Sequence, residues 1–337
     1  MTLDPRGRRA APLLLAGALL ALGACTAGRG QATYPIGRDQ AVAAVRSYAA
    51  AWARAVSRND LEGLRRIPTG AALAASTGEL QAREGTGEAA PAPPTASEIE
   101  VLVPPSGSRS SPERFLALVT WASPEAYPER EALEFQRTRP GAPWQVETRA
   151  RLIANTPLPA VVAGGDGRVR TTGDRGLRLS GRQVVETLSG YYSDEGQGGD
   201  PLASLADSLV APGPFTSGLL KRRKEANDSF QIQRQYRYQP GTYRTPAYQL
   251  RQGGGLMLVS LAGTRRLFPK DPNVVPGFQQ DASRQSLGGL VPPGQYTSLT
   301  YHTTLMLAVE VPPAKSRGQL RVVGIREVDI SIEQGPP

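Results

Sequence analysis

Two residue types with distinctive chemistry occur only once in the chain, as Cys25 and His302. Because there is no second cysteine or histidine, the sequence excludes a disulfide and predicts no metal site built on such ligands. His302 lies in a predicted strand over 297–311, on the face opposite to Tyr301 and Thr303. A Ser-His-acid triad is formally open to it, but the chain has no G-x-S-x-G motif to position a nucleophile. We therefore expect no metal, no cofactor and no catalysis, with one alternative, an extracytoplasmic hydrolase or isomerase that uses His302.

The surroundings of Cys25 define its chemistry more closely. Three arginines near the N-terminus precede an apolar run over 10–24, which leads directly into Cys25. This is the layout of a secretory signal, and the run is shorter than the ~20 residues that a membrane-spanning helix needs. The residues at its end resemble the bacterial lipobox, in which the cysteine receives a diacylglycerol before cleavage: Leu22, Gly23, Ala24 and Cys25.

The lipobox resemblance implies a signal peptide over residues 1–24 and a mature chain that begins at Cys25. Diacylglycerol and palmitate on this cysteine would anchor the protein to the outer, extracytoplasmic face of the cell membrane. The alternative is an ordinary signal that is cut elsewhere and leaves Cys25 as a free thiol. Removal of 24 residues from 337 leaves 313, enough for two domains.

The formal net charge of +9 suits an anionic membrane surface or cell wall. The arginines are scattered along the chain and are not interleaved with aromatic residues, so we expect no nucleic-acid binding. The densest basic run, 221–224, is followed closely by Glu225 and Asp228, and we interpret it as a solvated helix end.

The first half of the mature chain reads as helices followed by strands. Residues 25–37 are small and polar, which predicts a flexible tether. Apolar residues then recur at steps of three and four and predict a helix of about five turns from Arg38: Ala41, Val45, Tyr48, Trp52 and Val56. A short helix capped by Asn59 or Asp60 and a third helix follow. The period then changes to two, which predicts strands around 99–103, 114–121, 133–135 and 144–146, ending near 152.

The second half repeats this order after a stretch rich in proline and glycine over 153–179, which we interpret as a linker. Ser180 caps a helix, and further helices are predicted around 202–209 and 218–226. Strands follow over 230–238, 247–251, 256–262, 297–311 and 320–333. The series predicts an α+β fold of two successive domains, 38–152 and 180–333. A Val-Pro-Pro string at 103–105 and again at 311–313 agrees with an internal repeat.

One strand of the second half carries a candidate ligand pocket. Phe230, Ile232, Tyr236 and Tyr238 alternate on one face, and Arg234 interrupts the row. If this sheet encloses a pocket, the row would line it and Arg234 would hold an anionic head group, since an inward arginine is costly unless it is paired. The alternative places Arg234 at the sheet edge with its head in water.

A long amphipathic helix, a short helix that starts at Asn59-Asp60 and a curved antiparallel sheet resemble the NTF2-like, or cystatin-like, cone fold. The second half also resembles uncharacterised lipoproteins of actinobacteria, in segments 248–251, 254–256, 307–313 and 321–324. These segments are strand ends and turns, so the resemblance implies fold and location and brings no catalytic residues. NTF2-like enzymes use a His/Asp or Asp/Tyr pair in the cone.

These expectations describe a membrane-anchored extracytoplasmic lipoprotein with a binding or envelope-assembly role, and not an enzyme. Its expected partners are the membrane, through Cys25, and either an envelope protein or an amphiphilic ligand held in a cone.

Overall fold

The computed structural model describes residues 36–86, 94–104, 113–123, 126–139, 141–153, 159–164, 168–194, 206–243, 247–271 and 297–335. All of them fall within one compact unit, Pro35–Pro337, which is distinct from Met1–Tyr34. The predicted signal peptide, Cys25 and most of the predicted tether therefore lie outside the described residues. None of the described helices is long and apolar enough to span a membrane.

Three helices open the described chain: α1 (Arg38–Ser57), α2 (Leu61–Leu64) and α3 (Gly70–Thr86). The predicted apolar row of α1 is buried along its whole length. Of the two predicted caps of α2, Asp60 is the one that caps it, accepting a hydrogen bond from the backbone N–H of Gly63 at 2.8 Å. Ile36 is buried as well, so the last two residues of the predicted tether belong to the fold.

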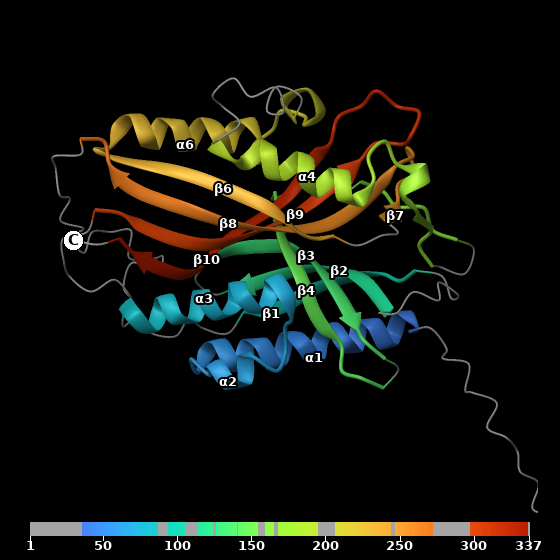
Figure 1. The fold of residues 1–337 in the computed structure, drawn as a ribbon. Helices are drawn as coiled ribbons and strands as arrows, with labels where there is room; N and C mark the ends of the chain where they lie inside the picture. Colours follow the sequence, from blue (N-terminus) through green and yellow to red (C-terminus); the bar gives the residue numbers. More distant parts are fainter. Residues whose placement is uncertain are drawn as a thin grey trace, which may run out of the picture. The chain divides into compact units, whose positions relative to one another are not determined.

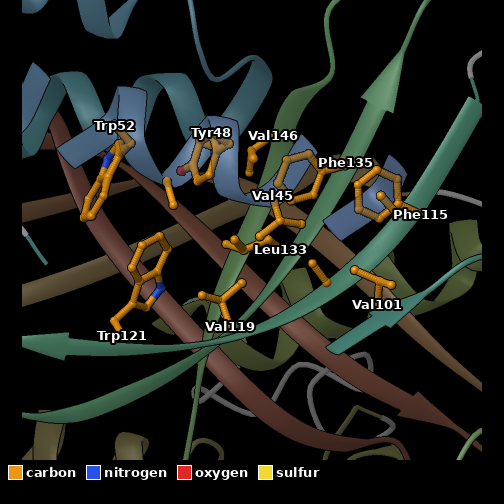
Figure 2. Close-up of a cluster of buried hydrophobic side chains, with 14 of the residues drawn as sticks. Val45, Tyr48, Trp52, Val101, Phe115, Val119, Trp121, Leu133, Phe135 and Val146 are labelled. Atoms are coloured by element: carbon orange, nitrogen blue, oxygen red, sulfur yellow. The ribbon is translucent and has the colours of Figure 1, made fainter. Parts of the chain in front are cut away.

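Four strands follow as an antiparallel meander: β1 (Thr95–Leu102), β2 (Glu113–Ser123), β3 (Ala126–Arg137) and β4 (Gln145–Leu152). Their alternating apolar residues face α1, α2 and α3. On this face Tyr48 packs edge-on against Phe135, and Phe135 stacks on Phe115 with ring centroids 4.7 Å apart (Figure 2). The prediction of helices followed by antiparallel strands is confirmed for this half.

The same order returns at Ser180, which caps α4 (Gly181–Tyr192) through a reciprocal pair of hydrogen bonds with Gln183. The short strand β5 (Thr171–Thr172) and the 3-10 helix η1 (Asp174–Gly176) precede this helix. It is followed by α6 (Ser217–Ser229), β6 (Ile232–Tyr243), β7 (Ala247–Gln249), β8 (Gly255–Pro269), β9 (Leu299–Val311) and β10 (Arg321–Gln334). Strands β6, β8, β9 and β10 pair antiparallel in that order and form a second meander. Strand β8 continues past its predicted end at 262, because its second half pairs with β6.

The two meanders join into one ten-stranded sheet, in the order β1-β2-β3-β4-β10-β9-β8-β7-β5, with β6 on β8. The junction is short, with Gly324 opposite Leu152 and Ile325 opposite Arg151. A Cβ atom on Gly324 would lie 2.8 Å from the Leu152 side chain, so a glycine allows the two strands to approach. Because one sheet runs through both halves, the prediction of two successive domains is not confirmed.

The sheet curls strongly, which brings strands that are far apart in its order into contact. One apolar cluster contains Leu116 and Leu118 of β2 together with Leu256 and Leu258 of β8. A second cluster lies between α1–α3 and the first meander, and a third lies between α4, α6 and the second meander. Figure 1 shows the helices on two sides with the strands between them.

Two predictions about connections need correction. Within the described part of the predicted linker 153–179, some residues pair with the sheet: β5 (Thr171–Thr172) pairs with β7, and the Val162 N–H donates to the Gln249 carbonyl at 2.8 Å. Val103 of the first Val-Pro-Pro string follows β1, and Val311 of the second is the last residue of β9. These two strands hold different places in the two meanders. The two strings therefore do not mark equivalent positions of a repeat.

Candidate functional site

Of the five residues predicted to line a ligand pocket, only four lie on a strand. Ile232, Arg234, Tyr236 and Tyr238 share one face of β6, but Phe230 precedes the strand and is 55% exposed. The Arg234 guanidinium lies over the Phe230 ring, 5.2 Å from its centroid, and donates to the Ala226 carbonyl at 3.4 Å. The two tyrosines are buried. Arg234 therefore contacts the end of α6 and Phe230, while Tyr236 and Tyr238 belong to a different group of side chains.

That group centres on Arg223 of α6, which is buried although it lies in the basic run interpreted as solvated. Its guanidinium donates to Glu327 at 3.0 Å, to the Tyr238 hydroxyl at 2.9 Å and to the Tyr192 carbonyl at 3.2 Å. It also lies 3.7 Å from the centroid of the Tyr236 ring. This arginine therefore holds α6 on the sheet by a hydrogen-bonded ion pair and a cation–π contact.

A second pair extends this cluster along β8 and β10. Arg265 donates to Asp329 at 2.7 Å, and its guanidinium lies 4.5 Å from the centroid of the Tyr301 ring. Burial raises the pKa of the Asp329 carboxyl, and the charge of Arg265 only partly offsets this. The charged side chains of this cluster are thus paired with one another.

The first half holds a matching cluster around Arg149 of β4, whose side chain is 2% exposed. Arg149 donates to both carboxylate oxygens of Glu131, at 2.8 and 3.0 Å, and its guanidinium lies 4.8 Å from the Trp52 ring centroid. The Trp121 indole N–H donates to Glu131 at 2.9 Å. Arg326 of β10 donates to Glu131 at 2.5 Å and also pairs with Glu79 of α3. One carboxylate thus joins β2, β3, β4 and β10.

The charges of this cluster act on one another strongly. Burial alone would raise the pKa of Glu131, but Arg149 and then Arg326 lower it below its ordinary value. Burial raises the pKa of the nearby Tyr48 hydroxyl to about 12. Tyr48 Oη, Trp52 Nε1 and two nitrogens of Arg149 are buried without a hydrogen-bond partner among the described residues. Since Arg149 lies over the Trp52 ring, a cation–π contact stands in for part of that bonding.

The other predicted residues lie elsewhere. His302 takes the face of β9 opposite to Tyr301, as predicted, where it is 39% exposed and its Nε2 lies 2.9 Å from Glu333. It contacts neither charged cluster through any hydrogen bond among the described residues. In the same described part of the chain, no three His, Cys, Asp or Glu side chains gather as a metal site. The lipobox and Cys25 are outside it.

The outer edge of β6 is covered by side chains. Asn227 accepts from the Arg234 N–H at 2.8 Å and donates to the Arg234 carbonyl at 2.9 Å, as a neighbouring strand would. Asp194 accepts from the Tyr236 N–H at 2.6 Å, and Ser193 accepts from the Tyr238 N–H at 2.8 Å. Because these backbone groups are already bonded, β6 is closed to the addition of another strand.

Strand β1 is the corresponding first strand of the other meander, and its outer edge is different. Among the described residues it pairs with β2 only, and no side chain is hydrogen-bonded to its backbone from the outer side. Most of its first six residues are exposed. A cavity of about 140 Å³ lies beside it. The lining residues come from both halves: Glu100, Leu102, Leu118, Arg130, Pro159, Ala160, Val161 and Leu256.

This open edge was not predicted from the sequence. The alternation of Ile99, Val101 and Val103 indicated a strand, but nothing in a single strand indicates whether a neighbour covers it. The buried Arg149 and Glu131 were also missed, because ion pairs between strands depend on the register. The structure shows that every residue from 146 to 150 of β4 is buried, and this burial carries no signature in the local sequence.

A family model described as a domain of unknown function (DUF8094) matches residues 34–329. It covers most of the chain, so this protein belongs to that family. No curated protein and no solved structure gives a significant match.

Proposed function

We propose that this chain is a membrane-anchored extracytoplasmic lipoprotein that binds a partner of the cell envelope and catalyses no reaction. The anchor is supported by the sequence that ends in Leu22, Gly23, Ala24 and Cys25, with the signal-like segment before it. The lipid would sit on Cys25, and the tether up to about Tyr34 would separate it from the folded unit.

The observation that carries the binding role is the edge of β1 beside the cavity, which no other described residue covers by backbone pairing. Natural sheets usually protect their edges, as β6 does here with Asn227, Asp194 and Ser193. An edge left open next to an apolar cavity provides both backbone hydrogen-bonding groups and a place for a side chain. This combination supports binding of an extended segment.

The charged clusters favour a structural role for the buried ionisable residues, separate from the binding role of β1. Glu131, Arg149, Arg223 and Glu327 are bound to one another and to aromatic rings, and each links a helix or a distant strand to the sheet. Groups engaged in this way stabilise a scaffold. We therefore assign these residues a structural role.

The finer fold proposal is that each half is an NTF2-like unit. It is supported by the common order of helices followed by a four-stranded meander, and by the meeting of the last strand of each meander, β4 with β10. A helix covers the first strand in both halves, α1 over β1 and α4 over β6.

The anchor is tested by expressing the full chain in a bacterium that processes lipoproteins, as wild type, Cys25→Ala and a tether control, Thr33→Ala. Wild type and the control are expected in the membrane fraction and labelled by an alkyne palmitate. Cys25→Ala should lose the label and remain unprocessed or be released. A Cys25→Ala chain that is labelled and processed like wild type would refute the anchor.

The binding role is tested in the same cells with a photo-crosslinking amino acid at Glu98 of β1 or, as the control, at Gln233 of β6. Both side chains are exposed. Crosslinks to another protein are expected from position 98 and not from position 233. Absence of crosslinks at both positions would contradict a partner on β1.

A further inference from the structure

The side chains of β1 divide between the two faces of the sheet. Ile99 and Val101 pack toward α1 in the apolar cluster of the first half. Glu98 accepts from the Thr120 hydroxyl at 3.2 Å, and Glu100, 55% exposed, lies 3.6 Å from Arg130. Glu100 and Leu102 line the cavity. Two carboxylates therefore stand on the side of the edge where the cavity lies.

The directions in which the backbone groups of β1 point follow from a hydrogen bond of Val103, the residue after the strand. The Val103 carbonyl accepts a hydrogen bond from the Val169 N–H at 2.9 Å, on the side away from β2. Since successive residues of a strand turn their backbone groups to opposite sides, Val101 and Ile99 also direct theirs outward. The open part of the edge thus presents the backbone groups of Ile99 and Val101 in register with Glu98 and Glu100.

We propose that this edge binds an extended peptide segment of a partner protein by strand addition, with an aliphatic side chain in the cavity and lysine or arginine beside Glu98 and Glu100. This inference rests on the proposed binding function and names the partner class. The cavity of about 140 Å³ is close to the roughly 150 Å³ that admits benzene in an engineered protein cavity. It therefore accommodates a side chain of the size of valine or leucine.

Charge decides between a foreign peptide and a second copy of this chain. Antiparallel pairing of two β1 strands centred on Ile99 would set Glu98 of one copy opposite Glu100 of the other. Like charges directly opposite in a sheet are destabilising. A basic segment instead places opposite charges there. The two carboxylates outnumber the one described arginine beside them, Arg130, so the segment also gains on-rate from electrostatic attraction.

The test is selection of a library of random decapeptides on the full chain in detergent micelles, followed by synthesis of the enriched sequences. We expect the enriched peptides to alternate aliphatic residues with polar ones and to contain lysine or arginine. N-methylation of alternate backbone nitrogens should weaken binding at least tenfold, because strand addition needs these N–H groups. Affinity is measured by fluorescence anisotropy.

Three variants locate the site. Glu98→Lys with Glu100→Lys should weaken binding roughly tenfold. Ala160→Phe, at an exposed position of the cavity lining, should block the side-chain pocket. Glu225→Lys, an exposed glutamate of α6 in the other half, is the control and should bind like wild type.

Peptides that bind equally well when N-methylated, or that bind all variants alike, would overturn strand addition at β1. Enrichment of acidic peptides that the Glu98→Lys, Glu100→Lys variant binds better would overturn the basic partner class while leaving the binding function intact. A dimer in native mass spectrometry that Ala160→Phe and the double lysine variant both change would assign the edge to a second copy. If position 98 crosslinks a protein in cells but no peptide is enriched, the proposed function stands and this inference fails.

Discussion

Strands β1 and β6 occupy the same place in the two meanders, yet their outer edges are finished differently. Around β6, Asn227 of α6 and the two residues that follow α4, Ser193 and Asp194, accept hydrogen bonds from the backbone N–H groups of the strand. Around β1, the helix α1 covers the face of the strand and leaves its edge open among the described residues. The comparison shows that a helix can cover the face of a strand without covering its edge. Among the described residues, both the face and the edge of β6 are covered, whereas only the face of β1 is.

The charged clusters differ between the halves in the same way. The pKa of the Glu131 carboxyl is lowered, whereas the pKa of the Asp329 carboxyl is raised although Asp329 pairs with Arg265. Among the described residues, two arginines donate hydrogen bonds to Glu131, and one donates to Asp329. A buried carboxylate is therefore stabilising here only where the cations outweigh the loss of hydration.

The largest effect is expected from Glu131→Ala. The change leaves Arg149 and Arg326 without their shared carboxylate, and removal of one partner of a buried pair costs about 3–5 kcal/mol. Urea unfolding of the full chain in detergent measures the loss of free energy of unfolding. Glu327→Ala, in the more exposed cluster of the second half, should cost less, about 1–3 kcal/mol. Equal losses would contradict the ranking of the clusters.

The next effect concerns α3, which lies close to β10. A Cβ atom on Gly78 would lie 2.0 Å from the Asp329 carbonyl oxygen, so Gly78→Ala must push the helix from the strand. We expect a loss of about 1–3 kcal/mol. Gly190→Ala in α4, where nothing lies within 4 Å, is the matched control and should be neutral or stabilising by up to about 1 kcal/mol. Calorimetric melting would show a lower Tm for the first variant only.

Opening the edge of β6 should cost about 1–2 kcal/mol and change association. Asn227→Ala removes both hydrogen bonds to the backbone of Arg234. Because the edge becomes able to pair, sedimentation should detect self-association at high concentration that wild type does not show. Gln233→Ala on the same strand serves as the control, and association of that control to the same extent would refute the sealing role of Asn227.

The smallest effects are opposite pH dependences. The lowered pKa of Glu131 gives stability that is present above its unfolded pKa of about 4.3 and is lost as pH falls through the lowered folded value. The raised pKa of Asp329 gives the reverse, a contribution present below about 3.9 and lost as pH rises through the raised value. The stability gap between wild type and Glu131→Gln should therefore widen with pH, and the gap to Asp329→Asn should narrow.

Much of the local structure could be predicted from the sequence, because it depends on neighbours a few residues apart. The three- and four-residue spacing from Ala41 to Val56 follows from helix geometry, and Ser180 with Gln183 forms a capping box on its own. The single sheet could not be predicted, since its junction is only two residue pairs long and involves Leu152 and Gly324. The burial of Arg223 was missed because its partner, Glu327, is far away in the sequence.

The most direct test of the central claim is amide hydrogen exchange of the full chain, read for the outward N–H groups of the two first strands. We predict slow exchange at Arg234, Tyr236 and Tyr238 of β6, whose N–H groups are bonded by Asn227, Asp194 and Ser193. At Ile99 and Val101 of β1 we predict fast exchange that becomes slow when a selected peptide is added. Equal protection of both edges without a peptide would contradict the account.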